Sequence, residues 1–267
     1  MVKVFCSIKE WRQIQQQDFL KEKELGFVPT MGNIHAGHLS LAKQSMVDNE
    51  LTLVSIYVNP TQFNNQFDLD NYPITQEQDI LSLTQLGVDY IFMPNYESIY
   101  SDNFSYQVCE NKNSLIMEGN HREGHFTGVL TVLMKFFQLI APTRVYMGEK
   151  DHQQLSLVRG MCEAFFMGIE LIACPTVRNQ EGLALSSRNS LLSHDQMQLA
   201  VEFAKVLRRG DNPQSIEQTL QDLGLKVDYV EQHEGRIYAA VWVDGVRLID
   251  NVEVLSLARV NLNSEIE

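Results

Sequence analysis

The sequence has no long hydrophobic run and few cysteines. No apolar stretch approaches the roughly 18 residues that a membrane-spanning helix requires, so we expect no membrane segment. Cys6, Cys109, Cys162 and Cys174 are scattered without a CxxC pair. This spacing argues against a zinc site and against a secreted disulfide framework. We therefore expect a protein of a reduced, cytoplasmic compartment.

Basic residues are also scarce. The 267 residues contain 21 lysines and arginines against 34 aspartates and glutamates, which gives a formal net charge of −13. This charge disfavours a general affinity for nucleic acid or for anionic membranes. An anionic ligand would therefore have to be bound by a local cluster of hydrogen-bond donors and cations.

Short β-rich runs alternate with longer segments of helical spacing over the first two thirds of the chain. The strands are predicted at 25–30, 51–59, 88–94, 144–151 and 169–177, and the helices at 38–50, 74–87, 128–140 and 153–166. Such alternation predicts βα units around a parallel sheet. Apolar residues at helical spacing are expected to take part in core or lobe packing: Met134, Phe136, Phe137, Met161, Phe165 and Phe166.

The character of the sequence changes after Pro175. Two helices are predicted at 192–210 and 215–224, followed by alternating runs at 226–234 and 236–255 with a hairpin signal, Asp-Gly, at 244–245. We therefore expect an α/β chain of two domains. Residues 1–175 would form a Rossmann-like parallel-sheet domain, and residues 176–267 a smaller α+β domain with a short antiparallel sheet.

The stretch VPTMGNIHAGH (28–38) stands where the first of these strands should pass into a helix. Gly32 permits a tight turn there, and Gly37 would let a ligand approach the backbone. His35 and His38 are three residues apart, so they share one face of the helix start and can donate hydrogen bonds to phosphate oxygens. The alternative on these residues alone is a helix cap with two surface histidines.

Other candidate residues lie elsewhere in the chain, and each also has a plainer interpretation. Lys150 in GEKD (148–151) ends a predicted strand, where α/β sheets bind ligands, but could lie in a solvated turn. Gln62 and Gln154 can both donate and accept hydrogen bonds, although isolated glutamines are more often exposed loop residues. On its residues alone, LSSR (185–188) is compatible with a turn that caps a helix.

The tetrapeptide HAGH resembles the HxGH signature of the nucleotidyltransferase superfamily, which includes the class I aminoacyl-tRNA synthetases. Five blocks are similar, in order and spacing, to those of the pantothenate synthetase family: PTMGNIHAGH (29–38), YVNPTQF (57–63), EGNHREGHFTGV (118–129), YMGEKDHQQL (146–155) and PTVRNQEGLALSSRN (175–189). The resemblance implies ATP-dependent condensation of pantoate with β-alanine through a pantoyl adenylate, with release of AMP and pyrophosphate. It also implies Mg²⁺ and a homodimer.

The resemblance further implies roles for individual residues. His38, His35 and Lys150 would be catalytic, Gln62 and Gln154 would bind pantoate, and Gln62 would also lie near β-alanine. No metal site on the protein is implied. The implied ATP-binding residues are Met31, Gly32, Asn33, Ile34, His35, Ala36, Gly37, His38, Gly148, Glu149, Lys150, Asp151, Val177, Leu185, Ser186, Ser187 and Arg188. The domain 176–267 would act as a lid, and Asn59 and Arg122 are weaker candidates for the pantoate pocket.

The sequence departs from the family pattern at three positions. Glu123 replaces the usual proline of one block, Thr127 a basic residue, and Ile74 an arginine. Glu123 could face solvent, pair with Arg122 or contact another subunit, so His121, Arg122 and His125 are not included among the main site residues.

Two other functions remain open on the residues. One is an adenylyltransferase that moves AMP onto a phosphate-ester acceptor, and the other is a nucleotide-binding regulatory protein. The two glutamines favour a carboxylate acceptor over a phosphate, and the retained histidines, lysine and arginine argue against the loss of catalysis.

Overall fold

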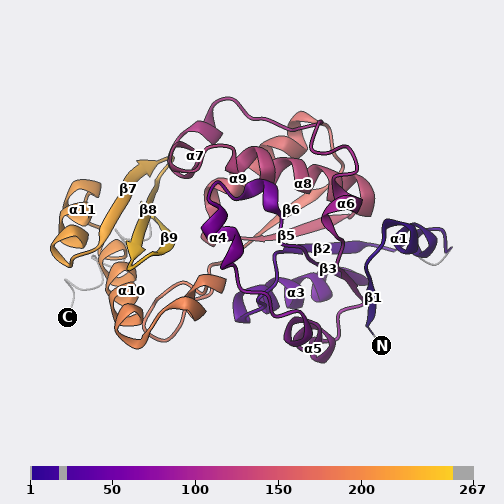
Figure 1. Ribbon diagram of the computed structural model, residues 1–267, viewed down its shortest axis with the longest axis horizontal. Coiled ribbons are helices and arrows are strands. Elements are labelled where there is room, and N and C mark those ends of the chain that lie inside the picture. The colour runs from indigo at the N-terminus through magenta and orange to yellow at the C-terminus, as the bar shows by residue number, and fades with distance from the viewer. Residues whose placement is uncertain (1, 18–22, 255–267) are drawn as a thin grey trace. The chain divides into compact units, whose positions relative to one another are not determined.

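The computed structural model describes residues 2–17 and 23–254, and it divides into two compact units (Figure 1). Unit 1 contains residues 1–149 and 153–175, and unit 2 contains residues 150–152 and 176–267. The three residues 150–152 thus group with unit 2, although unit 1 supplies the chain on both sides of them. Within the described part of the chain, no helix is long and apolar enough to cross a membrane.

Unit 1 is built on a parallel sheet of six strands in the order β1-β4-β3-β2-β5-β6. The strand predicted at 25–30 is confirmed with those bounds, and the other four predicted strands are confirmed with shorter bounds. Strand β1 is not predicted from the sequence, because this edge strand has only three residues and two of them are exposed. The strands are β1 (Lys3–Phe5), β2 (Leu25–Thr30), β3 (Leu51–Ile56), β4 (Tyr90–Phe92), β5 (Arg144–Gly148) and β6 (Glu170–Cys174).

Helices cover both faces of this sheet, and all four helices predicted in this region are confirmed. Among the described residues up to 152, the α-helices are α1 (Ile8–Gln15), α3 (Ala36–Asp48), α4 (Gln66–Asp70), α5 (Gln76–Leu86), α6 (Tyr96–Ile99), α7 (Glu118–His121), α8 (His125–Ile140) and α9 (His152–Ala164). Short 3-10 helices connect them: η1 (Pro60–Gln62), η2 (Asn113–Leu115) and η3 (Glu149–Asp151).

Neighbouring residues of each strand point to opposite faces, so the sheet has two apolar cores. Phe27 and Leu53 pack with α8 and α9, whereas the next residues, Val28 and Val54, pack with α3 and α5. Figure 1 shows α3 and α5 on one side of the sheet and α8 on the other. Burial of each such side chain stabilises the fold by about 1.5–3 kcal/mol, which explains why α8 is apolar nearly all round.

The core packing predicted for Phe136, Phe137 and Met161 is confirmed, whereas Phe165 and Phe166 do not lie in the core of unit 1. Helix α9 ends at Ala164, and the two rings are 55% and 94% exposed. Phe166 has a φ of +54°, so the chain turns away from the helical path at this point. The helical apolar spacing therefore continues in the sequence beyond the end of the helix itself.

The strand order creates a topological switch point between β2 and β5. From β2 the chain moves outward through β3 and β4 on one side, and it returns to the other side of β2 for β5 and β6. In open α/β sheets, ligands bind beyond the carboxyl ends of the strands at such a point. The loop after β2 and the turn after β5 leave the sheet there.

Unit 2 combines two helices with an antiparallel three-stranded sheet in the order β7-β8-β9. The predicted Asp-Gly hairpin is confirmed, because Asp244 and Gly245 join β8 to β9 with φ values of 44° and 89°, as a type I′ turn requires. The elements are the 3-10 helix η4 (Ser187–Leu191), α10 (His194–Leu207), α11 (Pro213–Asp222), β7 (Lys226–His233), β8 (Arg236–Val243) and β9 (Val246–Glu253).

Candidate active site

The two histidines of HAGH lie together at the start of α3. His35 is the N-cap residue and His38 occupies the first turn, with their ring centroids 4.0 Å apart. The Nδ1 atom of His35 accepts a hydrogen bond from the Gly37 amide at 3.1 Å. Because an accepting nitrogen carries no proton, the neutral His35 ring has its proton on Nε2. The cap thus sets the tautomer and leaves Nε2–H as the donor.

Gly37 is required here because the His35 ring lies against its backbone. A Cβ atom on Gly37 would lie 2.8 Å from Cε1 and 2.9 Å from Nδ1 of His35, closer than such atoms approach. A side chain at position 37 is therefore excluded by the imidazole of His35, and the approach of a ligand to the Gly37 backbone stays a prediction. The spacing of HxGH therefore has a local explanation in the helix cap.

A buried carboxylate accepts hydrogen bonds from the loop between β2 and α3. Asp79 in α5 is 2% exposed and accepts hydrogen bonds from the amides of Asn33 at 2.9 Å and Ile34 at 2.7 Å. The backbone can present both amides because Gly32 and Asn33 have positive φ values of 83° and 49°. These two N–H groups are thus already used, and the contacts that the loop offers to an anion must come from elsewhere in residues 31–38.

Gln62 lies close to this loop, at the end of η1. Its Nε2 atom is 3.1 Å from the Met31 sulfur, and its Oε1 atom accepts from Asn59 Nδ2 at 3.0 Å. Asn59 is fully committed, since it also donates to the Gly128 carbonyl and accepts from Thr61 and Tyr100. Asn59 therefore orients Gln62, whose amide keeps one N–H group and one lone pair for a ligand.

Two features of the surrounding structure hold η1 in place. Gly128 in α8 allows close packing, because a Cβ atom there would lie 2.4 Å from the Thr61 carbonyl oxygen. Burial raises the pKa of Tyr100 to about 12, so this residue remains a neutral phenol and donates to Asn59 Oδ1 at 2.9 Å. The orientation of Gln62 thus depends on Tyr100 at the end of α6 and on Gly128 in α8, as well as on its place after β3.

His125 and Arg122 contact the same segment. His125 Nδ1 lies 2.8 Å from the Gln62 carbonyl oxygen, and Arg122 Nη1 lies 3.2 Å from His125 Nε2. Since a carbonyl only accepts and a guanidinium only donates, the imidazole carries its proton on Nδ1. Arg122 also pairs with Glu118 at 3.5 Å, and Glu123 is exposed on the surface of this chain.

The two neighbouring glutamines of α9 differ in their environment. Gln153 is buried and uses its amide on the loop 113–118, donating to Asn113 and Ile116 and accepting from the Glu118 amide. Gln154, the predicted pantoate residue, is half-buried. Gly148 and Glu149 are also half-buried and lie at the carboxyl end of β5. The predicted residues of unit 1 therefore all follow carboxyl ends of β2, β3 or β5.

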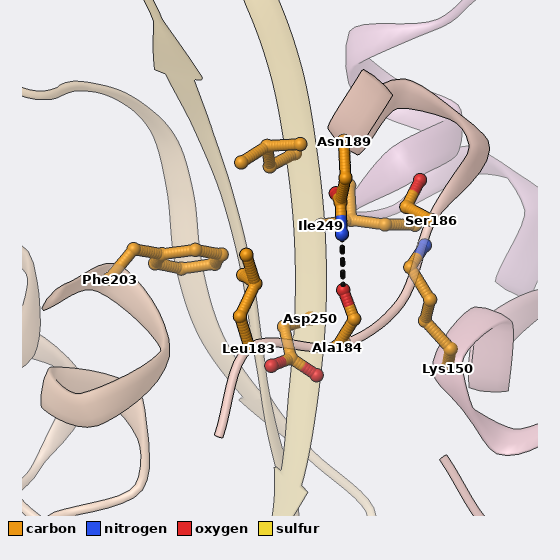
Figure 2. A pocket seen from close by; sticks show the side chains of 9 residues that line it. Lys150, Leu183, Ala184, Ser186, Asn189, Phe203, Ile249 and Asp250 are labelled. Carbon is orange, nitrogen blue, oxygen red and sulfur yellow. Dashed lines mark hydrogen bonds between the residues drawn. The ribbon is translucent and has the colours of Figure 1, made fainter. Parts of the chain in front are cut away.

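The other predicted residues belong to unit 2, where Lys150 and Ser186 line a small hollow together with Asn189 and Asp250 (Figure 2). The Lys150 side chain is 18% exposed, and its Nζ atom lies 3.7 Å from the carboxylate of Asp151, which is 47% exposed. Asn189 donates to the Ala184 carbonyl at 3.1 Å, as Figure 2 shows. The hollow has an ammonium group and a hydroxyl on one side.

The segment from Val177 to Leu185 forms a short hairpin that leads into η4. The Leu185 amide donates to the Val177 carbonyl at 2.9 Å, and Arg178 pairs with Ala184 across the hairpin. Ser186 caps η4 by accepting from the Arg188 amide at 3.3 Å. Ser187 is buried and Arg188 is half-buried. The carbonyl of Val177 is thus engaged within the hairpin.

Arg178 binds this hairpin to the antiparallel sheet. Its guanidinium forms a bidentate pair with Asp250, at 2.6 and 2.9 Å, and donates to the Gly182 carbonyl at 3.1 Å. The Asp250 side chain is 1% exposed. Sequence reasoning did not identify Arg178, Asp250 or Asp79, because single charged residues in a hairpin, a strand and a helix carry no signal of their partners.

Comparisons with known proteins identify the family to which this chain is similar. The family model of pantoate-beta-alanine ligase matches residues 3–253. The pantothenate synthetase of Legionella pneumophila is 48% identical over 250 residues, covering 94% of this chain and 99% of that protein. The pantothenate synthetase of Coxiella burnetii is 46% identical over 254 residues, covering 94% of this chain and 97% of that protein.

Solved structures give the same answer. The pantoate-beta-alanine ligase of Francisella tularensis, complexed with beta-gamma ATP and beta-alanine, matches with a TM-score of 0.91 and 38% identity over 96% of this chain and 98% of that one. The pantothenate synthetase of Thermus thermophilus matches with a TM-score of 0.85 and 33% identity, covering 95% and 99%. A family match along almost the whole described chain and relatives of nearly equal length show that the chain belongs to the pantoate-beta-alanine ligase family and is an enzyme of the ligase class.

Proposed function

We propose that this chain condenses pantoate with β-alanine at the expense of ATP, through a pantoyl adenylate, and releases AMP and pyrophosphate. The observation that carries the proposal is the pair of adjacent imidazoles at the start of α3, beyond a switch point of the sheet. The complex of the Francisella tularensis relative with beta-gamma ATP and beta-alanine supports these two compounds as substrates of this chain as well.

In the first step, a pantoate carboxylate oxygen attacks the α-phosphorus of ATP. A new oxygen–phosphorus bond forms, the bond to the bridging oxygen breaks, and the electron pair leaves with pyrophosphate. The Nε2–H donor of His35 and the ring of His38 would stabilise the charge that develops on the leaving group. The carboxylate needs no proton transfer before attack, so neutral donors are sufficient.

Gln62 and Gln154 would hold pantoate for that attack. An amide can donate to a carboxylate oxygen and accept from a hydroxyl without neutralising the attacking charge. The contact between Gln62 and Met31 joins the proposed pantoate group to the proposed ATP loop. Gln62→Ala and Gln154→Ala should therefore raise the pantoate requirement, since a lost polar contact costs about 1–3 kcal/mol.

In the second step, the β-alanine amine attacks the acyl carbon of the adenylate. The carbon–nitrogen bond forms, the carbon–oxygen bond to phosphate breaks, AMP leaves, and the amine loses a proton. We place β-alanine near Gln62. The amine must be neutral to attack, and no residue of this chain needs to become covalently modified in either step.

Unit 2 would supply the remaining contacts to ATP. Lys150 is the cation that we assign to the phosphates, with Asp151 beside it, and Ser186, Ser187 and Arg188 would bind the triphosphate. The backbone around Val177 and Leu185 would contact the adenine. The hollow shared by Lys150 and Ser186 supports a common role for these two residues.

Mg²⁺ fits this proposal as a companion of the nucleotide. Among the residues that the structure describes, no group of three or more His, Cys, Asp or Glu side chains could hold a metal ion. Mg²⁺ is commonly bound by phosphates with one or two carboxylates. When bound, it would neutralise charge on the phosphates, and Glu149 and Asp151 are the carboxylates nearest in sequence to Lys150.

Exchange of labelled pyrophosphate into ATP tests the proposed sequence of steps. Pantoate alone should support exchange, because adenylate formation is reversible and does not need the amine, and added β-alanine should convert the adenylate into amide and AMP. An adenylyltransferase would exchange only with its dinucleotide product, and a regulatory protein would not exchange at all. Absence of pantoate-dependent exchange in folded protein supplied with Mg²⁺ would overturn the proposal.

We also propose a homodimer, on the family resemblance alone. Sedimentation at micromolar concentration tests this assembly. A single species with the mass of one chain would contradict it.

A further inference from the structure

The turn that contains Lys150 is attached to the antiparallel sheet of unit 2. Asn251 in β9 donates from Nδ2 to the Lys150 carbonyl oxygen at 2.9 Å. Two residues further along, His152 Nδ1 lies 2.8 Å from the hydroxyl of Tyr238 in β8. The turn therefore has a contact with the sheet at each end, and these contacts explain why residues 150–152 group with unit 2.

The two side chains that hold the turn are direct neighbours. Tyr238 and Asn251 are paired in the register of β8 and β9, and paired residues of an antiparallel ladder project from the same face. Both are buried, with 6% and 3% exposure. The hairpin thus presents one phenol and one amide from a single cross-strand pair.

Arg236 fixes the direction of the Asn251 amide. Its Nη1 atom donates to Asn251 Oδ1 at 2.5 Å. A guanidinium can only donate, so the oxygen of the amide must face Arg236 and the NH₂ group must face the Lys150 carbonyl. In the opposite orientation of the amide, its NH₂ group would face the Arg236 guanidinium and its oxygen would face the Lys150 carbonyl, so neither hydrogen bond could form.

We propose that Asn251 and Tyr238 are positioning residues for Lys150 in the ligase reaction. The inference rests on the proposed function, in which Lys150 binds the phosphates of ATP. A lysine side chain is long and flexible, so the place that its ammonium group reaches depends on how firmly its backbone is held. The two contacts fix that backbone to the same unit that carries LSSR, so that the cation and the serine–arginine segment act as one phosphate-binding group.

Kinetic coupling between Asn251 and Lys150 tests this role. Asn251→Ala should lower kcat by about 10-fold to 100-fold, as small displacements of a positioned group can, and leave the KM for pantoate unchanged. Asn251→Asp should lower kcat similarly, because it keeps an acceptor for Arg236 but loses the donor to Lys150. In a Lys150→Ala background, Asn251→Ala should cause little further loss.

Tyr238→Phe provides a second variant, which removes one hydroxyl and should lower kcat by a smaller factor. Gln232→Ala is the matched control, because it removes an exposed amide from the neighbouring strand β7 and should leave kcat unchanged. Additive losses from Asn251→Ala and Lys150→Ala would overturn the proposal, since they would show that Asn251 acts through stability or through another group.

Amide hydrogen exchange gives a readout that does not depend on activity. In Asn251→Ala, exchange at residues 150–153 should accelerate by at least about 10-fold relative to Gln232→Ala, because the turn loses one of its two attachments. Unchanged exchange there would overturn the positioning role even in an active enzyme. Failure of the proposed function is recognised separately: the unsubstituted protein would then show no pantoate-dependent exchange of labelled pyrophosphate into ATP.

Discussion

The β2–α3 loop of unit 1 and the hairpin 177–185 of unit 2 are each held by one buried carboxylate, but in different ways. Asp79 accepts directly from two backbone amides of its loop. Asp250 acts through a side chain, the guanidinium of Arg178, which in turn binds the Gly182 carbonyl. The first arrangement uses up amides that could have bound a ligand, whereas the second holds the hairpin without using its amides.

This difference indicates how each region can meet ATP. In unit 1, two of the amides that bind anions in many strand–loop–helix turns are already paired with Asp79, so in the proposed function His35 and His38 would be the main donors. In unit 2, the hairpin depends on a pair of buried charges, and the loss of one charge leaves the other without compensation. Substitutions in the two regions should therefore differ in size and in kind.

The largest expected effect is on the stability of unit 2. Arg178→Met leaves the Asp250 carboxylate buried without its partner and should lower the free energy of unfolding by about 3–5 kcal/mol. Trp242 lies in β8 and Trp11 in α1, so urea unfolding followed in a Trp11→Phe background reports on unit 2. Lys205→Met, which breaks the exposed pair with Glu202, should cost about 0.5 kcal/mol or less. Equal losses in the two variants would contradict the prediction.

The next effect is on catalysis in unit 1. His38→Ala should lower kcat by about 10²–10³, because a donor aimed at developing charge acts mainly in the transition state, and ATP binding should weaken much less. Single-turnover adenylation measures this step directly. His194→Ala removes an exposed histidine at the start of α10 and serves as control. Adenylation by His38→Ala at the unsubstituted rate would refute the assigned role.

A smaller effect should follow from loss of the carboxylate beneath the loop. Asp79→Ala frees the amides of Asn33 and Ile34 and should cost about 1.5–3 kcal/mol of stability, together with a fall in kcat as His35 and His38 lose their fixed place. Urea unfolding in a Trp242→Phe background, where Trp11 reports on unit 1, measures the first quantity. Glu77→Ala changes an exposed carboxylate of the same helix and should do neither. Equal free energies of unfolding for Asp79→Ala and Glu77→Ala would show that the loop does not depend on the Asp79 carboxylate.

The smallest effect concerns the hairpin and η4. ATP should slow amide hydrogen exchange at residues 180–190 by a few-fold only, because the amides of Leu183 and Leu185 are already hydrogen-bonded. Residues 226–233 of β7 provide an internal reference whose exchange should not respond to ATP. Equal exchange of 180–190 with and without ATP would count against closure of LSSR over the nucleotide.

Most of the fold could be predicted from the sequence because its signals are local. The alternation of strands and helices, the Asp-Gly turn and the position of HAGH at a helix start depend on residues within a few positions of one another. The same local signals are misleading where an element is very short and where an apolar pattern continues past the end of a helix. It does not find the three-residue strand β1, and it carries the helical pattern of α9 on to Phe165 and Phe166, which are exposed.

The roles assigned to glycine and asparagine show where local reasoning about the site stops. The sequence predicts that Gly37 lets a ligand approach, and the structure adds that the ring of His35 lies where a side chain at position 37 would be. Asn59 was a weaker candidate for pantoate, but its amide is committed to Gln62, Gly128, Thr61 and Tyr100. In both cases the residue is where it was expected to be, and its partners decide what it can do.

The order of amino acids alone therefore specified the α/β class, the HxGH helix start and the residue types that suit phosphates and a carboxylate. Folding in three dimensions chose the partners: Asp79 reaches an amide 46 positions away, and Asn251 reaches the carbonyl of Lys150 across 101 positions. The physical reason is that a hydrogen bond needs its two atoms about 3 Å apart. Separation along the chain says nothing about that distance until the strands and helices have packed.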